Sequence, residues 1–460
     1  MQHGFDILII STRNSSQEEF WHKKLRASKG EICRDDALII TVAENWPGGA
    51  GTGLGTLYAY QKAVEKGKFK YHRDIAHMLR TGASIALYHT AGYGKELFPL
   101  LASEENAIAN LKIPSTHGSL LELVVKQTNE QFSTGREGRL SVFHCDQVFY
   151  PDRTFAYSPD SHLDLFCQTL PQNRPGKSLV VMEPSGAKVF DTSEPVQLST
   201  RFPIATNLSG FSLSWDMTQA LMEEFKGELE DQNARMNANT DFWMPLTVDY
   251  ETYLSMNPYP EHQMHYHRMA ALKSRIVKQN PSRPFIKAMD IGRNGYWWDF
   301  RSVKSYYLTL LKLTRETQEG HHMKQLFGIK SPIDHNQASR VIVDRNSCLI
   351  DSEVHGGSIK NSVLIGVKAE SLILENCVVI HSNLNSLETS NSLIYSVDDE
   401  HPLKLAQGTV RADITLKSSG KKYQMYSHLD RDGVSDWNTP LPQNPCSYSE
   451  IHQLVDQSKI

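Results

Sequence analysis

Glycines crowd one short segment of the chain, residues 46–56, which reads Trp-Pro-Gly-Gly-Ala-Gly-Thr-Gly-Leu-Gly-Thr. The segment follows an apolar run that predicts a strand and precedes a pattern that predicts a helix. In that context exposed backbone N–H groups and a helix N-terminus can hold phosphate oxygens. The alternative is a tight turn that binds no phosphate. Since five glycines in eight residues exceed the needs of a turn, the nucleotide-binding candidates are Gly48, Gly49, Gly51, Thr52 and Gly53.

A second glycine loop follows another apolar run and contains Gly92, Gly94 and Lys95. About one helix further along, Lys112 stands in a Lys-Ile-Pro sequence. An ammonium group is a compact charge that stabilises anionic oxygens. Lys95 and Lys112 are therefore the candidate catalytic residues, and Gly92 and Gly94 join the nucleotide-binding candidates. For Lys112 the alternative is a solvated surface lysine.

Two acids occupy positions where a metal ion could be held. Asp146 follows the apolar run 141–144, and Asp299 follows Trp297 and Trp298 just before a predicted helix. Mg²⁺ takes one or two carboxylates and leaves its other positions to phosphates and water. Either acid could therefore serve such an ion, and the family resemblance given below implies that Asp146 and Asp299 are Mg²⁺ ligands. The alternatives are a turn acid at the end of a strand and a charge at a helix N-terminus.

The elements that must position these groups follow from the apolar pattern. From position 1 to about position 330, strand-like runs alternate with longer helical patterns, which predicts an α/β domain with a mostly parallel sheet. Strands are expected at 7–10, 37–42, 84–89, 139–144 and 178–182. Helices are expected at 55–66, 302–313 and 214–225, the last with Ser214 as its N-cap.

From about residue 335 to 460 the pattern changes to short aliphatic steps separated by small or polar residues, followed by a C-terminal appendage that ends in a helix at 449–457. Leu372, Val378 and Leu384 fall six residues apart, as do Ile359 and Ile365. A six-residue step is a repeat of parallel β-helices, in which aliphatic residues stack from coil to coil. The spacing predicts a β-helix domain over 335–460. An antiparallel sheet of short strands is the alternative.

Composition narrows the class of protein. The chain has 460 residues, with 48 Lys and Arg against 52 Asp and Glu and a net charge of −4. This near-neutral balance argues against nucleic-acid binding, which needs a basic face. The 40% hydrophobic content excludes a disordered chain. The six cysteines are scattered, and no apolar run is long enough to span a membrane. We expect a cytoplasmic protein without a membrane partner.

The two glycine loops, the Lys-Ile-Pro sequence and the two acids resemble the sugar-1-phosphate nucleotidyltransferases, or NDP-sugar pyrophosphorylases. The layout of the loops is most similar to fucose-1-phosphate guanylyltransferases. The resemblance implies a three-layer, Rossmann-like GT-A nucleotidyltransferase domain over 1–330, followed by a left-handed parallel β-helix. It implies Mg²⁺-dependent formation of an NDP-sugar, with GDP-fucose favoured, from GTP or UTP and a sugar-1-phosphate. It also implies a substrate-binding role for Asn207 and Gly210, in a sequence similar to the sugar-contacting strand of that family.

The chain departs from the family at its charged positions. Where the family loop has an arginine, this chain has Gly53, and the corresponding place in the second loop is Glu96. A carboxylate there would repel a leaving pyrophosphate. The candidates to supply the missing positive charge are Lys95, Lys112, Lys287 and Arg293, and we take Lys287 as a substrate-binding candidate. The alternative is a catalytically inactive, nucleotidyltransferase-like regulatory or binding protein.

Other histidines raise further alternatives. An acyltransferase acting through the β-helix would need a catalytic histidine, for which His355 and His381 are the candidates. The segment 261–267 carries three histidines, but without an obvious carboxylate or cysteine partner we expect no metal there. The sequence leaves the oligomeric state open, and an assembly of identical chains would form through the β-helix.

Overall fold

The computed structural model describes residues 3–114, 118–152, 160–171, 175–330 and 341–458. The chain forms two compact units. Unit 1 consists of Met1–Gly92, Val125–His144 and Phe149–Trp297, and unit 2 consists of Tyr93–Val124, Cys145–Val148 and Trp298–Ile460. The sequence predicted one boundary near residue 330. The structure instead assigns two earlier segments to unit 2, because residues such as Phe98 and Asn106 contact Trp437 and His452 of the C-terminal part.

Unit 1 is built on a nine-stranded mixed sheet in its described residues, with the order β10-β6-β9-β4-β3-β1-β2 and with β7 and β8 attached beside β9. The pairs β1–β2, β1–β3, β3–β4 and β6–β10 are parallel, whereas β9 runs antiparallel to β4, β6 and β7. The strands are β1 (Ile7–Thr12), β2 (Leu38–Ala43), β3 (Ile85–His89), β4 (Arg139–His144), β6 (Leu163–Thr169), β7 (Gly176–Glu183), β8 (Gly186–Val196), β9 (Ile204–Ser214) and β10 (Ile286–Asp290). All five predicted strands are confirmed, with small differences at their ends.

The helices of unit 1 include α1 (Ser15–Ala27), α2 (Gly51–Lys70), α3 (Ile75–Arg80), α6 (Trp215–Glu224), α7 (Lys226–Asp231), α8 (Met244–Thr247), α9 (Tyr250–Met256) and α10 (Pro260–Gln279). A π-helical turn, η3, spans Ala238–Trp243. The predicted N-cap of α6 is confirmed, because the Ser214 hydroxyl accepts the backbone N–H of Met217 at 3.2 Å. The predicted start of α2 at residue 55 is wrong, since the helix begins inside the glycine segment at Gly51.

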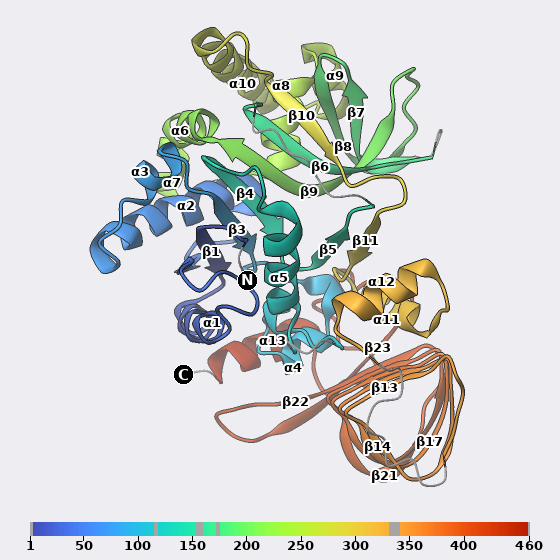
Figure 1. Ribbon diagram of the computed structural model, residues 1–460. Coiled ribbons are helices and arrows are strands. Elements are labelled where there is room, and N and C mark those ends of the chain that lie inside the picture. The colour runs from blue at the N-terminus through green and yellow to red at the C-terminus, as the bar shows by residue number, and fades with distance from the viewer. Residues whose placement is uncertain (1–2, 115–117, 153–159, 172–174, 331–340, 459–460) are drawn as a thin grey trace. The chain divides into compact units, whose positions relative to one another are not determined.

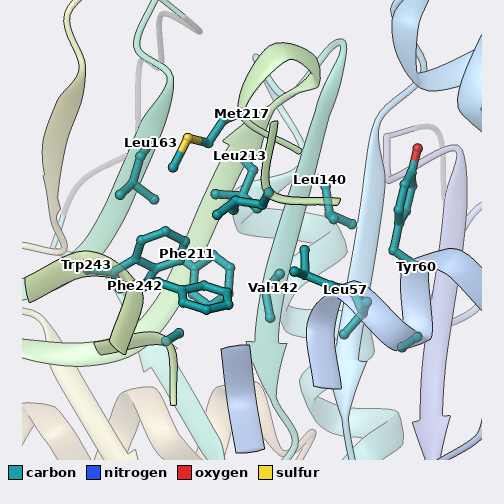
Figure 2. Packing of buried hydrophobic residues seen from close by; sticks show 14 of the residues in the cluster. Leu57, Tyr60, Leu140, Val142, Leu163, Phe211, Leu213, Met217, Phe242 and Trp243 are labelled. Atoms are coloured by element: carbon teal, nitrogen blue, oxygen red, sulfur yellow. The ribbon is translucent and has the colours of Figure 1, made fainter. Parts of the chain in front are cut away.

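The core of unit 1 joins α2 to the sheet. Leu57 of α2 belongs to one buried cluster with Val142 of β4, Phe211 of β9, and Phe242 and Trp243 of η3 (Figure 2). Phe211 and Trp243 meet edge to face with their ring centroids 5.0 Å apart. Burying each such side chain contributes about 1.5–3 kcal/mol to folding. The glycine-rich N-terminus of α2 is therefore carried on a rigid element.

The described residues of unit 2 contain two six-stranded sheets, drawn in orange and red in Figure 1. One follows the order β12-β15-β17-β19-β21, with β14 beside β17, and the other follows β13-β16-β18-β20-β22-β23. Apart from the antiparallel pair β22–β23, the pairings are parallel. The strands are β12 (Val341–Val343), β13 (Cys348–Ile350), β14 (Glu353–Val354), β15 (Gly357–Lys360), β16 (Val363–Ile365), β17 (Lys368–Glu375), β18 (Val378–Ile380), β19 (Asn383–Ser390), β20 (Leu393–Tyr395), β21 (Asp398–Lys404), β22 (Thr409–Thr415) and β23 (Lys422–His428).

Most paired strands of these sheets lie 15 residues apart along the chain, and a few pairs lie one or two residues further apart. Val363 pairs with Val378, and Val378 pairs with Leu393. The same interval separates hydrogen-bonded asparagines, such as Asn346 and Asn361, whose side chains meet at 3.2 Å. The predicted six-residue stacking interval is therefore wrong, because residues six apart lie on successive strands along the chain. The mainly parallel pairing excludes the antiparallel alternative and is compatible with a parallel β-helix.

The helices of unit 2 include α4 (Leu100–Ser103), α11 (Val303–Leu310), α12 (Gln318–Leu326) and α13 (Tyr448–Gln457), with 3-10 turns η1 (Lys95–Leu97), η2 (Ile108–Asn110) and η4 (Leu311–Thr314). The predicted helices near 302–313 and 449–457 are confirmed, although the first ends in the 3-10 turn η4. Three remaining elements contain residues of both units: α5 (Leu120–Phe132), β5 (Gln147–Tyr150) and β11 (Tyr296–Asp299). Among the described residues, no helix combines the length and apolar character that crossing a membrane requires.

Candidate functional site

The glycine segment of unit 1 has an open half and a packed half. Gly48 and Gly49 adopt φ values of +74° and +83°, and a Cβ at either position would meet no described atom within 4 Å. Gly51 also has φ +74°, but a Cβ there would lie 2.5 Å from the carbonyl oxygen of Met236. Glycine is thus needed at Gly51 both for its backbone conformation and for a close approach of another chain segment.

Segment 234–238 occupies part of the predicted phosphate cradle. The carbonyl of Met236 accepts the N–H of Gly53 at 2.9 Å, and the Thr52 hydroxyl accepts the N–H of Ala238 at 3.0 Å. On the other side, the carboxylate of Glu44 accepts the N–H of Ala50 at 3.2 Å, and burial raises the pKa of Glu44. Polar groups of the protein therefore occupy Thr52 and Gly53, and the Gly49 N–H donates to the Trp46 carbonyl at 3.0 Å. The open half of the loop, where a Cβ would meet no described atom, is at Gly48 and Gly49.

The contrast between Gly48 and Gly51 predicts different costs for one substitution. Gly48→Ala should lose about 1–2 kcal/mol of stability, because a left-handed backbone strains an L-residue. Gly51→Ala carries the same strain at the same φ and adds a clash with the Met236 carbonyl. Urea denaturation of the two variants measures the difference. Equal losses of stability in the two variants would show that the Met236 carbonyl does not constrain the side chain at position 51.

Unit 2 brings together the two predicted metal ligands. The Oδ1 atom of Asp146 is buried and has no hydrogen-bond partner among the described residues. Burial raises the pKa of Asp146 to about 6, with Arg301 lowering it and the charges of Asp299 and Glu96 raising it. The backbone N–H of Phe300 donates to the Asp146 carbonyl at 2.9 Å and ties the two acid-bearing segments together. Asp146, Asp299, Glu96 and Arg301 are called the acidic cluster below.

Arg301 is the member of the acidic cluster that the sequence analysis missed. Its guanidinium forms a bidentate ion pair with Asp299. Nε donates to Oδ1 at 2.9 Å, and Nη2 donates to Oδ2 at 3.0 Å. Such bidentate pairs are the strong form of an arginine–carboxylate contact. An arginine close after a candidate ligand is visible in the sequence, but its hydrogen bonds are visible only in the structure.

These contacts test whether the cluster suits Mg²⁺. Asp146 fits, because a buried carboxylate oxygen without a hydrogen-bond partner is costly unless a ligand satisfies it. Asp299 fits only after it releases Arg301, since both of its oxygens accept from that guanidinium. The described residues contain no group of three or more His, Cys, Asp and Glu side chains arranged to hold a metal ion. Within 261–267, the side chain of His265 bonds to the Asp241 carbonyl at 2.5 Å.

The remaining candidates lie in separate places. Within unit 2, Lys95 Nζ lies 4.9 Å from the centroid of the Trp437 ring, and Lys112 Nζ lies 3.6 Å from Glu104. A Cβ at Gly94 would lie 2.4 Å from Leu101, so this glycine is required by packing. Within unit 1, a Cβ at Gly92 would meet no described atom within 4 Å.

The substrate-binding candidates all belong to unit 1. Lys287 forms an exposed ion pair with Asp160 at 2.7 Å. The side-chain nitrogen of Asn207 donates to Asn239 at 3.0 Å. A Cβ at Gly210 would lie 2.7 Å from the ring of Phe166, which gives this glycine a packing role.

Comparison with known proteins finds similarity among solved structures. No family model matches the sequence, and no curated protein is significantly similar to it. Among solved structures, the chain is similar to CTP:phosphocholine cytidylyltransferase from Streptococcus pneumoniae (LicC), at 11% identity and a TM-score of 0.25. The match covers 49% of this chain and 96% of that chain. At that TM-score the likeness carries no argument about what this chain binds.

Proposed function

We propose that the chain is a sugar-1-phosphate nucleotidyltransferase, which forms an NDP-sugar and pyrophosphate from an NTP and a sugar-1-phosphate. The observation that carries the proposal is the buried oxygen of Asp146, which has no hydrogen-bond partner among the described residues and feels the charge of Asp299. The two acids were selected from sequence segments that resemble this family, and both contribute to one acidic cluster. GTP as the nucleotide and fucose-1-phosphate as the sugar rest on the layout of the glycine loops alone.

The proposed reaction needs positioning and charge neutralisation rather than a protein nucleophile. A phosphate oxygen of the sugar-1-phosphate attacks the α-phosphorus of the NTP, and the bond to the bridging oxygen breaks to release pyrophosphate. Mg²⁺ held by Asp146 and Asp299 would neutralise phosphate charge when bound. Backbone N–H groups near Gly48 bind triphosphate oxygens, and the Gly49 N–H does so after it releases the Trp46 carbonyl. Lys95 and Lys112 offset the charge of the leaving group.

The proposal includes a fold for each part of the chain. A GT-A nucleotidyltransferase domain over 1–330 is supported by the parallel strands β1–β4 and by a glycine loop that opens a helix. A left-handed β-helix over 335–460 is supported by parallel strands, most of which pair at an interval of 15 residues. In the sugar site, Asn207 and Lys287 would exchange their bonds to Asn239 and Asp160 for the substrate.

Three observations favour the second candidate, a nucleotidyltransferase-like protein that binds a ligand without turnover. Arg301 donates to both carboxylate oxygens of Asp299. The Met236 carbonyl accepts the Gly53 N–H. Glu96 adds negative charge to the acidic cluster. Each contact occupies or repels a group that the reaction would use. Such a protein would still bind a nucleotide through the open half of its glycine loop.

A substrate panel separates the two candidates. The full chain is incubated with Mg²⁺ and each pairing of GTP, UTP, ATP and CTP with a set of sugar-1-phosphates, and pyrophosphate release is measured. Nucleotide-dependent thermal shifts are recorded in parallel, because a ligand that binds only the native state raises Tm. Turnover with one pairing supports the enzyme. A thermal shift without turnover in any pairing supports the binding protein.

A further inference from the structure

The backbone of Lys112 is held at both of its polar groups by tyrosine hydroxyls. The Lys112 N–H donates to the hydroxyl of Tyr395 at 2.9 Å, and the Tyr306 hydroxyl donates to the Lys112 carbonyl at 2.5 Å. Tyr395 lies on β20 and Tyr306 lies on α11, so both partners are remote in sequence. Loop backbone more often bonds to water or to neighbouring residues. The two tyrosine hydroxyls therefore hold the backbone of Lys112 in place from two different elements.

The side chain of Lys112 is held by the same network. Its Nζ lies 3.6 Å from Oε2 of Glu104, and Oε1 of Glu104 accepts the Tyr395 hydroxyl at 2.8 Å. Glu104 is 7% exposed, whereas the Lys112 side chain is 36% exposed. Tyr306 and Tyr395 are fully buried and meet edge to face, with their ring centroids 6.2 Å apart. The ammonium is thus the exposed end of an otherwise buried and rigid group.

We propose that Glu104, Tyr306 and Tyr395 are positioning residues, which hold the Lys112 ammonium where it meets an anionic phosphate group of a nucleotide. The phosphate ligand rests on the proposed function, whereas the holding of Lys112 stands on the geometry of unit 2. Because Tyr395 lies on β20, one of the C-terminal sheets takes part in holding Lys112. A flexible lysine loses side-chain entropy when it binds an anion, and a lysine that is already held loses less.

The protonation state of Glu104 makes the holding of the Lys112 ammonium depend on pH. Burial raises the pKa of Glu104 to about 7, while Lys112 and the Tyr395 hydroxyl lower it and Glu105 raises it. Among the described residues, the groups that face Glu104 are Lys112, Tyr395, Glu105 and, through its ring on Tyr395, Tyr306. The imidazole of His381 also interacts with the charge of Lys112. Below pH 7 Glu104 is neutral and its attraction for the ammonium falls. Above pH 7 it is ionised, and the ammonium is held.

The holding of Lys112 is tested without any turnover. Lysines of the full chain are reductively methylated with ¹³C, and the Lys112 signal is identified as the one that is missing in Lys112→Arg. In the chain without substitutions this signal should shift with a midpoint near pH 7 as Glu104 ionises. In Glu104→Gln the inflection should be absent. A signal without that inflection, or one that keeps it in Glu104→Gln, would overturn the proposal.

The phosphate ligand is tested with tripolyphosphate as the probe. Added tripolyphosphate should shift the Lys112 signal, and Tyr395→Phe and Tyr306→Phe should each weaken its binding about fivefold, since each loses one hydrogen bond to the lysine backbone. Tyr448→Phe is the matched control. Its buried hydroxyl lies in the same unit but donates to the Tyr426 carbonyl, at 2.8 Å, rather than to the Lys112 backbone.

The outcomes separate this inference from the proposed function. If tripolyphosphate shifts the Lys112 signal and both tyrosine variants weaken its binding, the inference stands even where no substrate pair is turned over. If turnover is found, Glu104→Gln should also remove the inflection near pH 7 from the KM for the NTP while Tyr448→Phe retains it. A Lys112 signal that tripolyphosphate does not move, or that Tyr448→Phe changes as much as Tyr395→Phe, would overturn the inference.

Discussion

Asp146→Asn is expected to reduce pyrophosphate release by about 10³-fold or more, because a metal ion that neutralises phosphate charge contributes several kcal/mol to the barrier. The substitution keeps the size of the side chain and removes its charge. Since the carboxylate sits in a buried position that raises its pKa to about 6, the neutral amide should fold as well as the acid does. Initial rates with the active substrate pair, and Tm by calorimetry, measure both effects.

The control for this experiment is Asp430→Asn in the same unit. Asp430 forms an exposed ion pair with Lys304 at 2.7 Å, at 72% side-chain exposure, and takes no part in the acidic cluster. Exposed pairs contribute little to stability, so this variant should keep both its rate and its Tm. Near-full activity in Asp146→Asn would remove the basis of the proposed enzyme. A large loss of Tm in the same variant would give Asp146 a structural role instead.

Asp164→Ala is expected to destabilise unit 1 by about 3–5 kcal/mol, the usual cost of breaking a buried ion pair from one side. Asp164 is fully buried, and its Oδ2 lies 2.6 Å from Arg139 and 3.7 Å from Arg136. Its Oδ1 accepts the Ser161 hydroxyl at 2.5 Å. The substitution takes this carboxylate away from two buried guanidinium groups. Urea denaturation followed by far-UV circular dichroism measures the loss.

Asp160→Ala provides the comparison, because Asp160 pairs with Lys287 at 2.7 Å on the exposed surface of the same unit. Its cost should stay within about 1 kcal/mol, since water screens the pair and replaces it. The difference between the two variants measures the cost of leaving two buried guanidinium groups without their carboxylate, compared with one exposed ammonium. Equal costs for Asp164→Ala and Asp160→Ala would show that Arg136 and Arg139 find other compensation when the carboxylate is lost.

Local features of this chain could be predicted from its sequence. Alternation of apolar runs located the strands β1 to β4 and β7, and a serine before an apolar helix located the N-cap of α6 at Ser214. These features depend on residues within a few positions of one another, so their physical causes are present in any short window of sequence. Asp146 and Asp299 were selected in another way, because the segments that carry them resemble those of a known family.

How those features are used depends on packing between remote segments. The start of α2 at Gly51 depends on the Met236 carbonyl, which comes from a distant part of the chain. The hydrogen bond between Tyr395 and the Lys112 backbone joins residues that are 283 positions apart, so no local pattern indicates it. The six-residue spacing misled for the same reason, because partners in parallel sheets are chosen by the length of the whole coil. Contacts between remote segments depend on how the chain closes its loops and buries its core, and a one-dimensional pattern does not contain that information.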